Sequence, residues 1–174
     1  MDDNCLNEYN LEDLISNTTF ESELFIATKR ETKEKFLIKR YKKSILTMKR
    51  LKIYLNNEIY FLNNICHENI IKYYNHKIGN NYIYIILEFC NGGTLRNCLD
   101  LYKTEYNRPF SQNIIQHISK QIISALSYLH KNRILHRNIK LDNILVHFPT
   151  EEDKKRLNML SCKIKVRDFF LQNI

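Results

Sequence analysis

Glycine and proline are scarce in this sequence, which has only three glycines and two prolines among 174 residues. Both residues mark turns and linkers, so the composition gives no sign of a flexible connection between domains. The sequence contains no internal repeat and no long low-complexity stretch, although asparagine is frequent. Its 44% hydrophobic and 26% charged residues are ordinary for a globular protein of one domain.

Long apolar runs and regularly spaced cysteines are also missing. No apolar run approaches the ~18 residues that a membrane span needs. The first residues, from Met1 to Asn4, are acidic and polar, unlike a secretory signal peptide. The five cysteines are odd in number and lack the spacing of metal ligands, which favours reduced, mostly buried thiols. We therefore expect an intracellular, cytoplasmic protein with no membrane span.

Positive charge dominates the sequence. The net charge is +8, and lysine and arginine are dense between Lys29 and Arg50. Such runs occur both in nucleic-acid-binding proteins and on solvated surfaces. Only Phe36 and Tyr41 place aromatic rings in this run, too few for a platform on which bases stack. We favour a solvated basic surface with no specific nucleic-acid partner, and nucleic-acid binding is the alternative.

The first half of the chain predicts a five-stranded sheet and one helix. The helix covers residues 44–64, with Ser44 as its N-cap and Glu58 beside its apolar face. That face is formed by Leu51, Leu55, Ile59 and Leu62. The predicted strands are 12–17, 24–28, 35–40, 70–74 and 82–87.

The second half predicts helices at 94–102 and 111–131, the longer one capped by Ser111. A charged excursion follows at 149–156, and a short strand begins at residue 163. The apolar stripe of the longer helix is expected in the core. It consists of Ile115, Ile118, Ile122, Ala125 and Leu129.

Residues 135–145, with the sequence LHRNIKLDNIL, resemble the catalytic loop H-R-D-[LI]-K-x-x-N of protein kinases in its Ser/Thr-specific form. In that family the Asp accepts the proton of the substrate hydroxyl, the Lys steadies the transferring phosphate and the Asn holds Mg²⁺. Lys140 and Asn143 stand in the last two places. Asn138 stands in the place of the Asp, and an amide oxygen is barely basic.

The resemblance implies an α+β fold of the bilobal protein-kinase type. Residues 1–90 would form the N-terminal lobe, with the five-stranded sheet and the helix at 44–64. Residues 88–93 would form the hinge, and residues 91–174 an incomplete, mostly helical C-terminal lobe. The excursion at 149–156 and the style of the motifs also give a loose resemblance to autophagy-initiating Ser/Thr kinases.

A nucleotide site follows from the same resemblance. The sequence FLIK at 36–39 is similar to the kinase motif V-A-I-K, so Lys39 is the candidate that grips the α- and β-phosphates, with Glu58 as its helix partner. Leu37 would lie against adenine and adds bulk there. The remaining cofactor-binding positions that the resemblance implies are Leu24, the gatekeeper Leu87, the backbones of Glu88 and Cys90, and Leu145 beneath adenine.

Two further motifs depart from the family pattern. Where kinases have G-x-G-x-x-G, residues 16–21 have the sequence SNTTFE, and their side chains would crowd the phosphates. Asp168 is the candidate Mg²⁺ ligand of the D-F-G motif, but Phe170 replaces its glycine. No counterpart of the activation segment or of A-P-E is found after it.

Three functions are compatible with these motifs. The favoured hypothesis is a pseudokinase of Ser/Thr type that binds ATP and Mg²⁺ weakly or not at all and acts through protein partners. The alternative is an active or weakly active Ser/Thr protein kinase, because a general base contributes only about 10²- to 10⁴-fold to the rate. The third is a truncated product with no independent function.

The absence of later kinase helices also predicts self-association. Without those helices, Ile115, Ile118 and Ile122 would lack an intramolecular partner and become available to another protein or to a second copy. We also expect the segment after Gly93 to be less well ordered than the first lobe.

Overall fold

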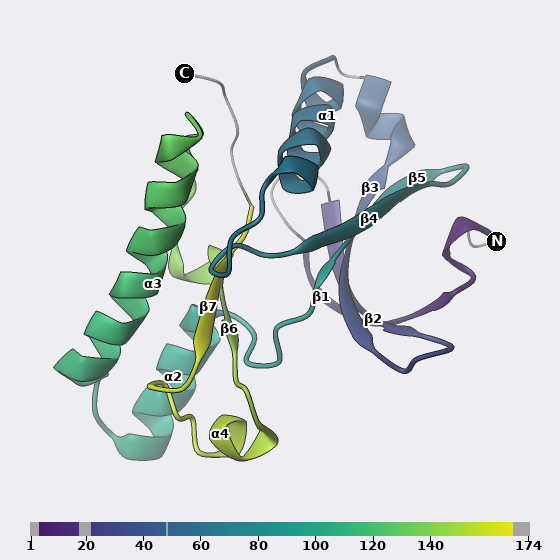
Figure 1. Cartoon of the computed structure of the whole chain (residues 1–174). Coiled ribbons are helices and arrows are strands. Elements are labelled where there is room, and N and C mark those ends of the chain that lie inside the picture. Colours follow the sequence, from purple (N-terminus) through teal and green to yellow (C-terminus); the bar gives the residue numbers. More distant parts are fainter. Residues whose placement is uncertain (1–3, 18–21, 48, 169–174) are drawn as a thin grey trace. The chain divides into compact units, whose positions relative to one another are not determined.

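The computed structural model describes residues 4–17, 22–47 and 49–168 (Figure 1). The chain divides into two compact units. The first contains Met1–Ile65 and Lys72–Phe89, and the second contains Cys66–Ile71 and Cys90–Ile174. Within the described part of the chain, no helix is both long enough and apolar enough to span a membrane.

A five-stranded antiparallel sheet forms the frame of the first unit, in the order β1-β2-β3-β5-β4. The central strand pairs with a neighbour on both sides, and its residues 36–39 are buried. The five predicted strands are therefore present, with shifted ends. They are β1 (Tyr9–Asn17), β2 (Ser22–Lys29), β3 (Lys35–Lys42), β4 (Tyr73–Ile78) and β5 (Tyr82–Glu88).

Alternation of side chains gives this sheet two buried faces. One face, which we call the N-terminal face, carries Phe36, Ile38 and Ile86, and the 3-10 helix η1 (Asn4–Leu6) packs Leu6 against it. The opposite face, which we call the helix face, carries Lys39 and Tyr41. Helix α1 (Lys49–Asn64) lies on this side, because its Glu58 bonds to both of those side chains.

Helix α1 begins later than predicted. Strand β3 continues to Lys42, and the Lys43 N–H still donates to the Asn81 carbonyl at 2.8 Å, so the chain is tied to the β4–β5 turn where the helix was expected. The 3-10 helix η2 (Lys43–Thr47) then redirects the chain. Ser44 is therefore not the N-cap of α1, and the predicted start at residue 44 is wrong.

The strand predicted at 70–74 also begins later, at Tyr73. The Ile71 N–H donates to the Val166 carbonyl at 3.0 Å, and the Asn69 carbonyl accepts from the Val166 N–H at 2.9 Å. Residues 66–71 therefore belong to the second unit, and the sequence returns to the sheet only after them.

The second unit has a helical part and a two-stranded antiparallel sheet. Ser111 accepts a bond from the Ile114 N–H, which confirms its capping role, and Thr94 and Thr150 cap the other two helices in the same way. The bounds are α2 (Leu95–Tyr106), α3 (Gln112–Lys131), η3 (Leu141–Asn143), β6 (Ile144–His147), α4 (Glu151–Lys155) and β7 (Lys163–Val166).

Helix α2 ends four residues later than the predicted 94–102. Tyr106 explains the extension, because its ring lies 4.6 Å from that of Tyr102 and its hydroxyl donates to the Arg156 carbonyl at 2.7 Å. Arg156 follows α4, so the charged excursion at 149–156 contains a helical turn that supports α2. The apolar periodicity of α2 alone could not predict this contact, because its partner lies fifty residues later.

The buried face of α3 is partly different from the predicted stripe. Ile118 and Leu129 are buried as expected, but Ile115 is 53% exposed, and Ile114 takes its place in the core. Two adjacent isoleucines fit the helical period almost equally well, so the period alone could not choose between them. The assignment of Ile115 to the core was wrong.

One of the scarce glycines, Gly92, and the buried cysteines Cys98 and Cys162 pack tightly in the second unit. A Cβ atom at Gly92 would come within 2.7 Å of the Val146 carbonyl oxygen, which accepts the Gly92 N–H at 2.9 Å. Burial raises the pKa of Cys98 to about 11 and that of Cys162 to about 12. Both thiols therefore stay protonated and serve as small apolar side chains.

Candidate functional site

A buried ion pair joins the sheet of the first unit to α1. The Lys39 ammonium donates to Oε1 of Glu58 at 2.7 Å, and both side chains are only 3% exposed. Lys39 comes from the centre of β3, and Glu58 from the buried face of the helix. A charge at this depth is costly unless it is paired, so each side chain depends on the other. The structure brings together the two residues that the resemblance to kinases paired.

Tyr41 is a third member of this cluster, and it was missed from the sequence. Its hydroxyl donates to Oε2 of Glu58 at 2.5 Å, so both carboxylate oxygens have a donor. Burial, and then the charge of Glu58, raise the pKa of Tyr41 well above its usual value, which keeps the hydroxyl protonated. The signal was available: residues two apart in a strand lie on the same face, so Tyr41 had to lie beside Lys39.

The leucines assigned to nucleotide binding in this unit lie on the same face as Lys39. Leu24 is opposite Lys39 in the β2–β3 pairing, and Leu37 is opposite Leu87 in the β3–β5 pairing. All three leucines are buried. Glu88 ends β5, where its N–H donates to the Lys72 carbonyl at 2.9 Å.

The second unit contains the remaining predicted site residues. His136 and Asn143 are buried in the catalytic loop, Asn138 is half-buried and Lys140 is exposed. Cys90 and Leu145 are buried, with Leu145 in β6. The predicted site residues thus form two groups, one in each unit, and each group is described by itself.

Histidine and asparagine side chains fix the shape of the catalytic loop. His136 Nδ1 accepts the Asn138 N–H at 3.2 Å, and its Nε2 lies 3.0 Å from the Arg167 carbonyl oxygen. Asn143 Nδ2 donates to the Asn138 carbonyl at 2.9 Å. Burial lowers the pKa of His136 to about 4, so the ring is neutral at pH 7. Since Nδ1 is an acceptor, the proton of the neutral ring is on Nε2.

Arg167 connects this loop to Asp168, and it too was missed from the sequence. Its backbone N–H donates to the Asn143 carbonyl at 3.0 Å, and its guanidinium donates to the Asp142 carbonyl at 3.2 Å. The Nε atom lies 3.7 Å from a carboxylate oxygen of Asp168, whose φ of +58° is in the left-handed region. Arg167 is 6% exposed, so its charge acts on Asp168 with little screening by water.

Two predicted features lie outside the described residues. They are Thr18 to Glu21 of the glycine-free loop, and Phe169 with Phe170 after Asp168.

A family model for the protein kinase domain matches residues 20–173. The chain belongs to the protein kinase family. This confirms both the resemblance and the predicted α+β kinase fold.

Three curated kinases illustrate the relationship. The chain is 38% identical over 92 residues to mitogen-activated protein kinase kinase kinase 3 of Arabidopsis thaliana, covering 53% of this chain and 14% of that protein. It is 35% identical over 115 residues to human serine/threonine-protein kinase ULK1, covering 66% and 10%. It is 42% identical over 90 residues to mouse serine/threonine-protein kinase Nek9, covering 52% and 9%. The matched part thus spans at most 14% of the length of these kinases.

Proposed function

We propose that this kinase domain is a pseudokinase of Ser/Thr type, which binds ATP weakly and acts through protein partners. The observation that carries the proposal is Asn138 in the place of the catalytic Asp. The loop around it is ordered by His136 and Asn143, so a side chain at residue 138 is held by the loop whatever its chemistry. An amide in that place cannot take a proton from a hydroxyl near neutral pH.

Arg167 adds a second reason. In an active kinase the Asp of D-F-G binds Mg²⁺, and here a buried guanidinium lies 3.7 Å from Asp168. The like charge of Arg167 disfavours a divalent cation at that carboxylate. Both Arg167 and Asn138 therefore act against phosphoryl transfer.

The donor set for Mg²⁺ is otherwise suitable. Asn143 uses its amide nitrogen on the Asn138 carbonyl, which leaves the amide oxygen as its ligand atom. An amide oxygen and the carboxylate of Asp168 are the hard ligands that Mg²⁺ takes. When bound, the ion would neutralise charge on the ATP phosphates. We propose Asn143 and Asp168 as its ligands, with affinity weakened by Arg167.

The first unit supports the retention of nucleotide binding. Glu58 holds the Lys39 ammonium in one position, and Tyr41 holds the Glu58 carboxylate in turn. We propose that Lys39 contacts the phosphates, while Leu24, Leu37, Leu87 and Leu145 contact adenine together with the backbones of Glu88 and Cys90. The bulk of Leu37 against the ring is one reason to expect weak affinity.

An active Ser/Thr kinase is the second candidate. The observation that favours it is the intact ion pair of Lys39 and Glu58 at 2.7 Å. Phosphoryl transfer depends largely on positioning and charge neutralisation, so a missing base slows the reaction without abolishing it. Lys140 would then steady the transferring phosphate.

Radiolabelled ATP with a basic protein substrate tests the proposal. We expect no incorporation above that of a Lys39→Ala variant, and no rescue by Asn138→Asp alone, because Arg167 still acts on Asp168. Incorporation by the natural chain that disappears in Lys39→Ala would establish the active kinase instead. Calorimetry with Mg²⁺-ATP separately tests the nucleotide site, where sub-micromolar affinity would contradict weak binding.

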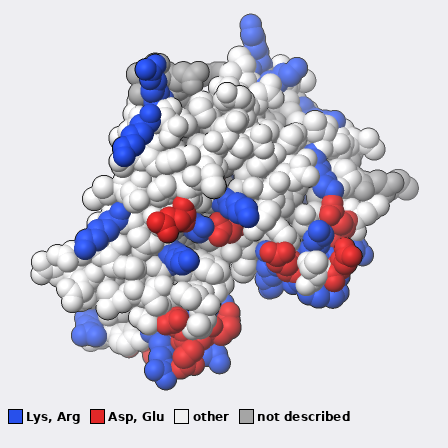
Figure 2. Space-filling view, in the orientation of Figure 1, with Lys and Arg blue, Asp and Glu red and all other residues white. Residues whose placement is uncertain are grey.

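Part of the dense basic run is paired with acidic residues. Four of its residues, Lys29, Lys35, Lys39 and Arg40, are paired with glutamates. Among the described residues on the face in Figure 2, lysine and arginine are scattered and are mixed with acidic residues in several places. We propose protein partners and no specific nucleic acid, and a cytoplasmic location that rests on the cysteine pattern.

Self-association through α3 remains a prediction with a changed surface. Ile118 is buried, so it is not available to a partner. Ile122 is partly buried against the core. Ile115 is 53% exposed and keeps its predicted place, and Ile123, which is 64% exposed, would replace Ile118.

A further inference from the structure

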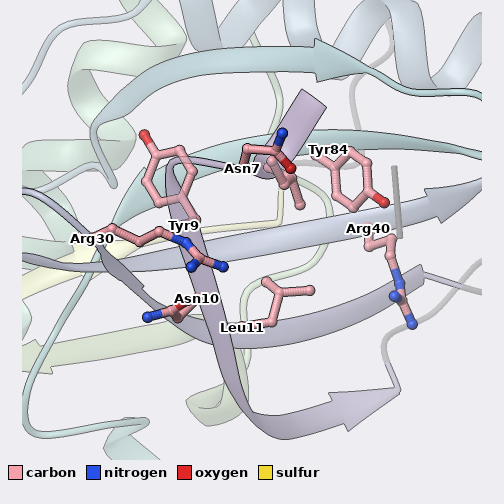
Figure 3. A pocket seen from close by; sticks show the side chains of 8 residues that line it. Asn7, Tyr9, Asn10, Leu11, Arg30, Arg40 and Tyr84 are labelled. Carbon is pink, nitrogen blue, oxygen red and sulfur yellow. The ribbon is translucent and has the colours of Figure 1, made fainter. Parts of the chain in front are cut away.

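A cavity of about 400 Å³ lies at the N-terminal face of the sheet in the first unit (Figure 3). This volume falls in the range of roughly 300–1,000 Å³ that small-molecule sites have. Its lining consists of two leucines, two tyrosines, two asparagines and two arginines, with no acidic residue. Lys39 is on the opposite face of the sheet, so the cavity is separate from the proposed nucleotide site.

Arg30 is the charged group available to a ligand in this cavity. Its backbone N–H donates to the Glu8 carbonyl at 2.8 Å, which fixes the start of its side chain. Its neighbours Lys29 and Lys35 are paired with glutamates, whereas the Arg30 guanidinium has no ion-pair partner among the residues that the structure describes. In Figure 3 this guanidinium points toward the space between Asn7 and Leu11.

Arg40 has a different role, because its charge is already satisfied. Its guanidinium lies 2.7 Å from Glu23 and is within 4.6 Å of the ring centres of Phe25 and Tyr82. These contacts hold Arg40 as a fixed wall of the cavity. The positive charge left for a ligand is therefore that of Arg30.

We propose that this cavity binds a small organic anion with one carboxylate or phosphate group. Arg30 would bind the anionic group with its planar fork, and the exposed amide of Asn7 would donate to the same group. The body of the ligand would lie against Leu11 and the rings of Tyr9 and Tyr84. Burial raises the pKa of Tyr9, so this tyrosine brings no negative charge to the site.

An NMR titration of the ¹⁵N-labelled full chain tests the proposal with benzoate, phenyl phosphate, inorganic phosphate and benzyl alcohol. We expect the two aromatic anions to shift the amide signals of Asn7, Asn10 and Arg30, and to bind more tightly than the other two probes. The relative affinity of benzoate and phenyl phosphate identifies the anionic group. Arg30→Gln should weaken binding about tenfold, the effect of losing one charged hydrogen bond.

Lys33→Gln is the matched control, because it removes one charge from the same β2–β3 turn without touching the lining. It should leave the affinity unchanged. Arg30→Lys keeps the charge but loses the planar fork, so its affinity should lie between those of Arg30→Gln and Lys33→Gln. It replaces Arg30→Gln if that variant does not fold. Equal losses in Arg30→Gln and Lys33→Gln would overturn the proposal, as would binding of inorganic phosphate as tight as that of phenyl phosphate. Amide shifts centred on Lys39 would also overturn the proposal. The absence of shifts at about 10 mM ligand would overturn it as well, because even a weak site with a Kd of about 1 mM would be nearly saturated at that concentration.

Discussion

The two units differ in how closely their buried polar groups match those of the kinase family. In the first unit, Lys39 and Glu58 are of the residue types that the kinase family has in these places, and the Tyr41 hydroxyl donates a further hydrogen bond to Glu58. In the second unit, the loop keeps its hydrogen bonds while Asn138 and Arg167 alter its charges. The difference shows that shape and chemistry can separate, because side chains of His136 and Asn143 hold the loop by bonds to its backbone although an amide stands at residue 138.

The largest effect is expected for Glu58→Gln. The substitution leaves the Lys39 ammonium buried without its carboxylate, so the free energy of unfolding should fall by about 3–5 kcal/mol. Urea denaturation of the full chain measures it. Glu31→Gln, in an exposed turn, is the control and should change little. A loss below about 1 kcal/mol would mean that Lys39 finds another partner or gives up its proton.

Tyr41→Phe should lower the free energy of unfolding by about 1.5–3 kcal/mol, because Oε2 of Glu58 loses its donor in a dry site. ATP affinity should fall as well, since the carboxylate that orients Lys39 is less constrained. Tyr60→Phe removes a hydroxyl from a residue that is 64% exposed and should be neutral. If both variants behave alike, Tyr41 contributes packing and not its hydrogen bond.

In the second unit, His136 should make the free energy of unfolding depend on pH. Its pKa of about 4 in the folded chain is below the usual 6.5, so the unfolded chain binds more protons between these values. The contribution to stability is present above pH 6.5 and is lost as the pH falls toward 4. Between pH 7 and pH 5 the loss should be about 2 kcal/mol.

A His136→Gln variant isolates this term, because its amide keeps a donor for the Arg167 carbonyl but does not titrate. Denaturation at both pH values should show a smaller loss in the variant than in the natural chain. Equal losses would assign the pH dependence to other groups.

The smallest effect compares two serines that the sequence marked as helix caps. Ser111→Ala removes the cap of α3 and should cost about 1 kcal/mol. Ser44→Ala should cost much less, because Ser44 lies in η2 and α1 begins at Lys49. Thermal unfolding of the two variants measures the difference, and an equal cost would show that Ser44 stabilises the start of α1 after all.

Much of the fold followed from the sequence because the anchors are local. The strands and the cap at Ser111 depend on alternation and capping chemistry, and the pair of Lys39 and Glu58 was predicted from the resemblance to kinase motifs. Tyr41 and Arg167 were missed for different reasons. Tyr41 needed only the alternation of side chains along a strand, which places it beside Lys39. Arg167 gains its role from contacts with Asp142 and Asn143, which are distant in sequence. The exchange of Ile115 for Ile114 likewise depended on packing that the helical period does not contain.

The segment 66–71 has a consequence for the order of folding. Asn69 bonds to Ile164, 95 residues later, and Val166 bonds to both Asn69 and Ile71. During synthesis, Asn69 and Ile71 leave the ribosome well before Ile164 and Val166 have been added to the chain. Closing so long a loop is slow, and until it closes the buried Ile70 and Ile71 are exposed to other chains. Strand β7, the last strand that the structure describes, therefore protects a segment that is synthesised nearly a hundred residues earlier.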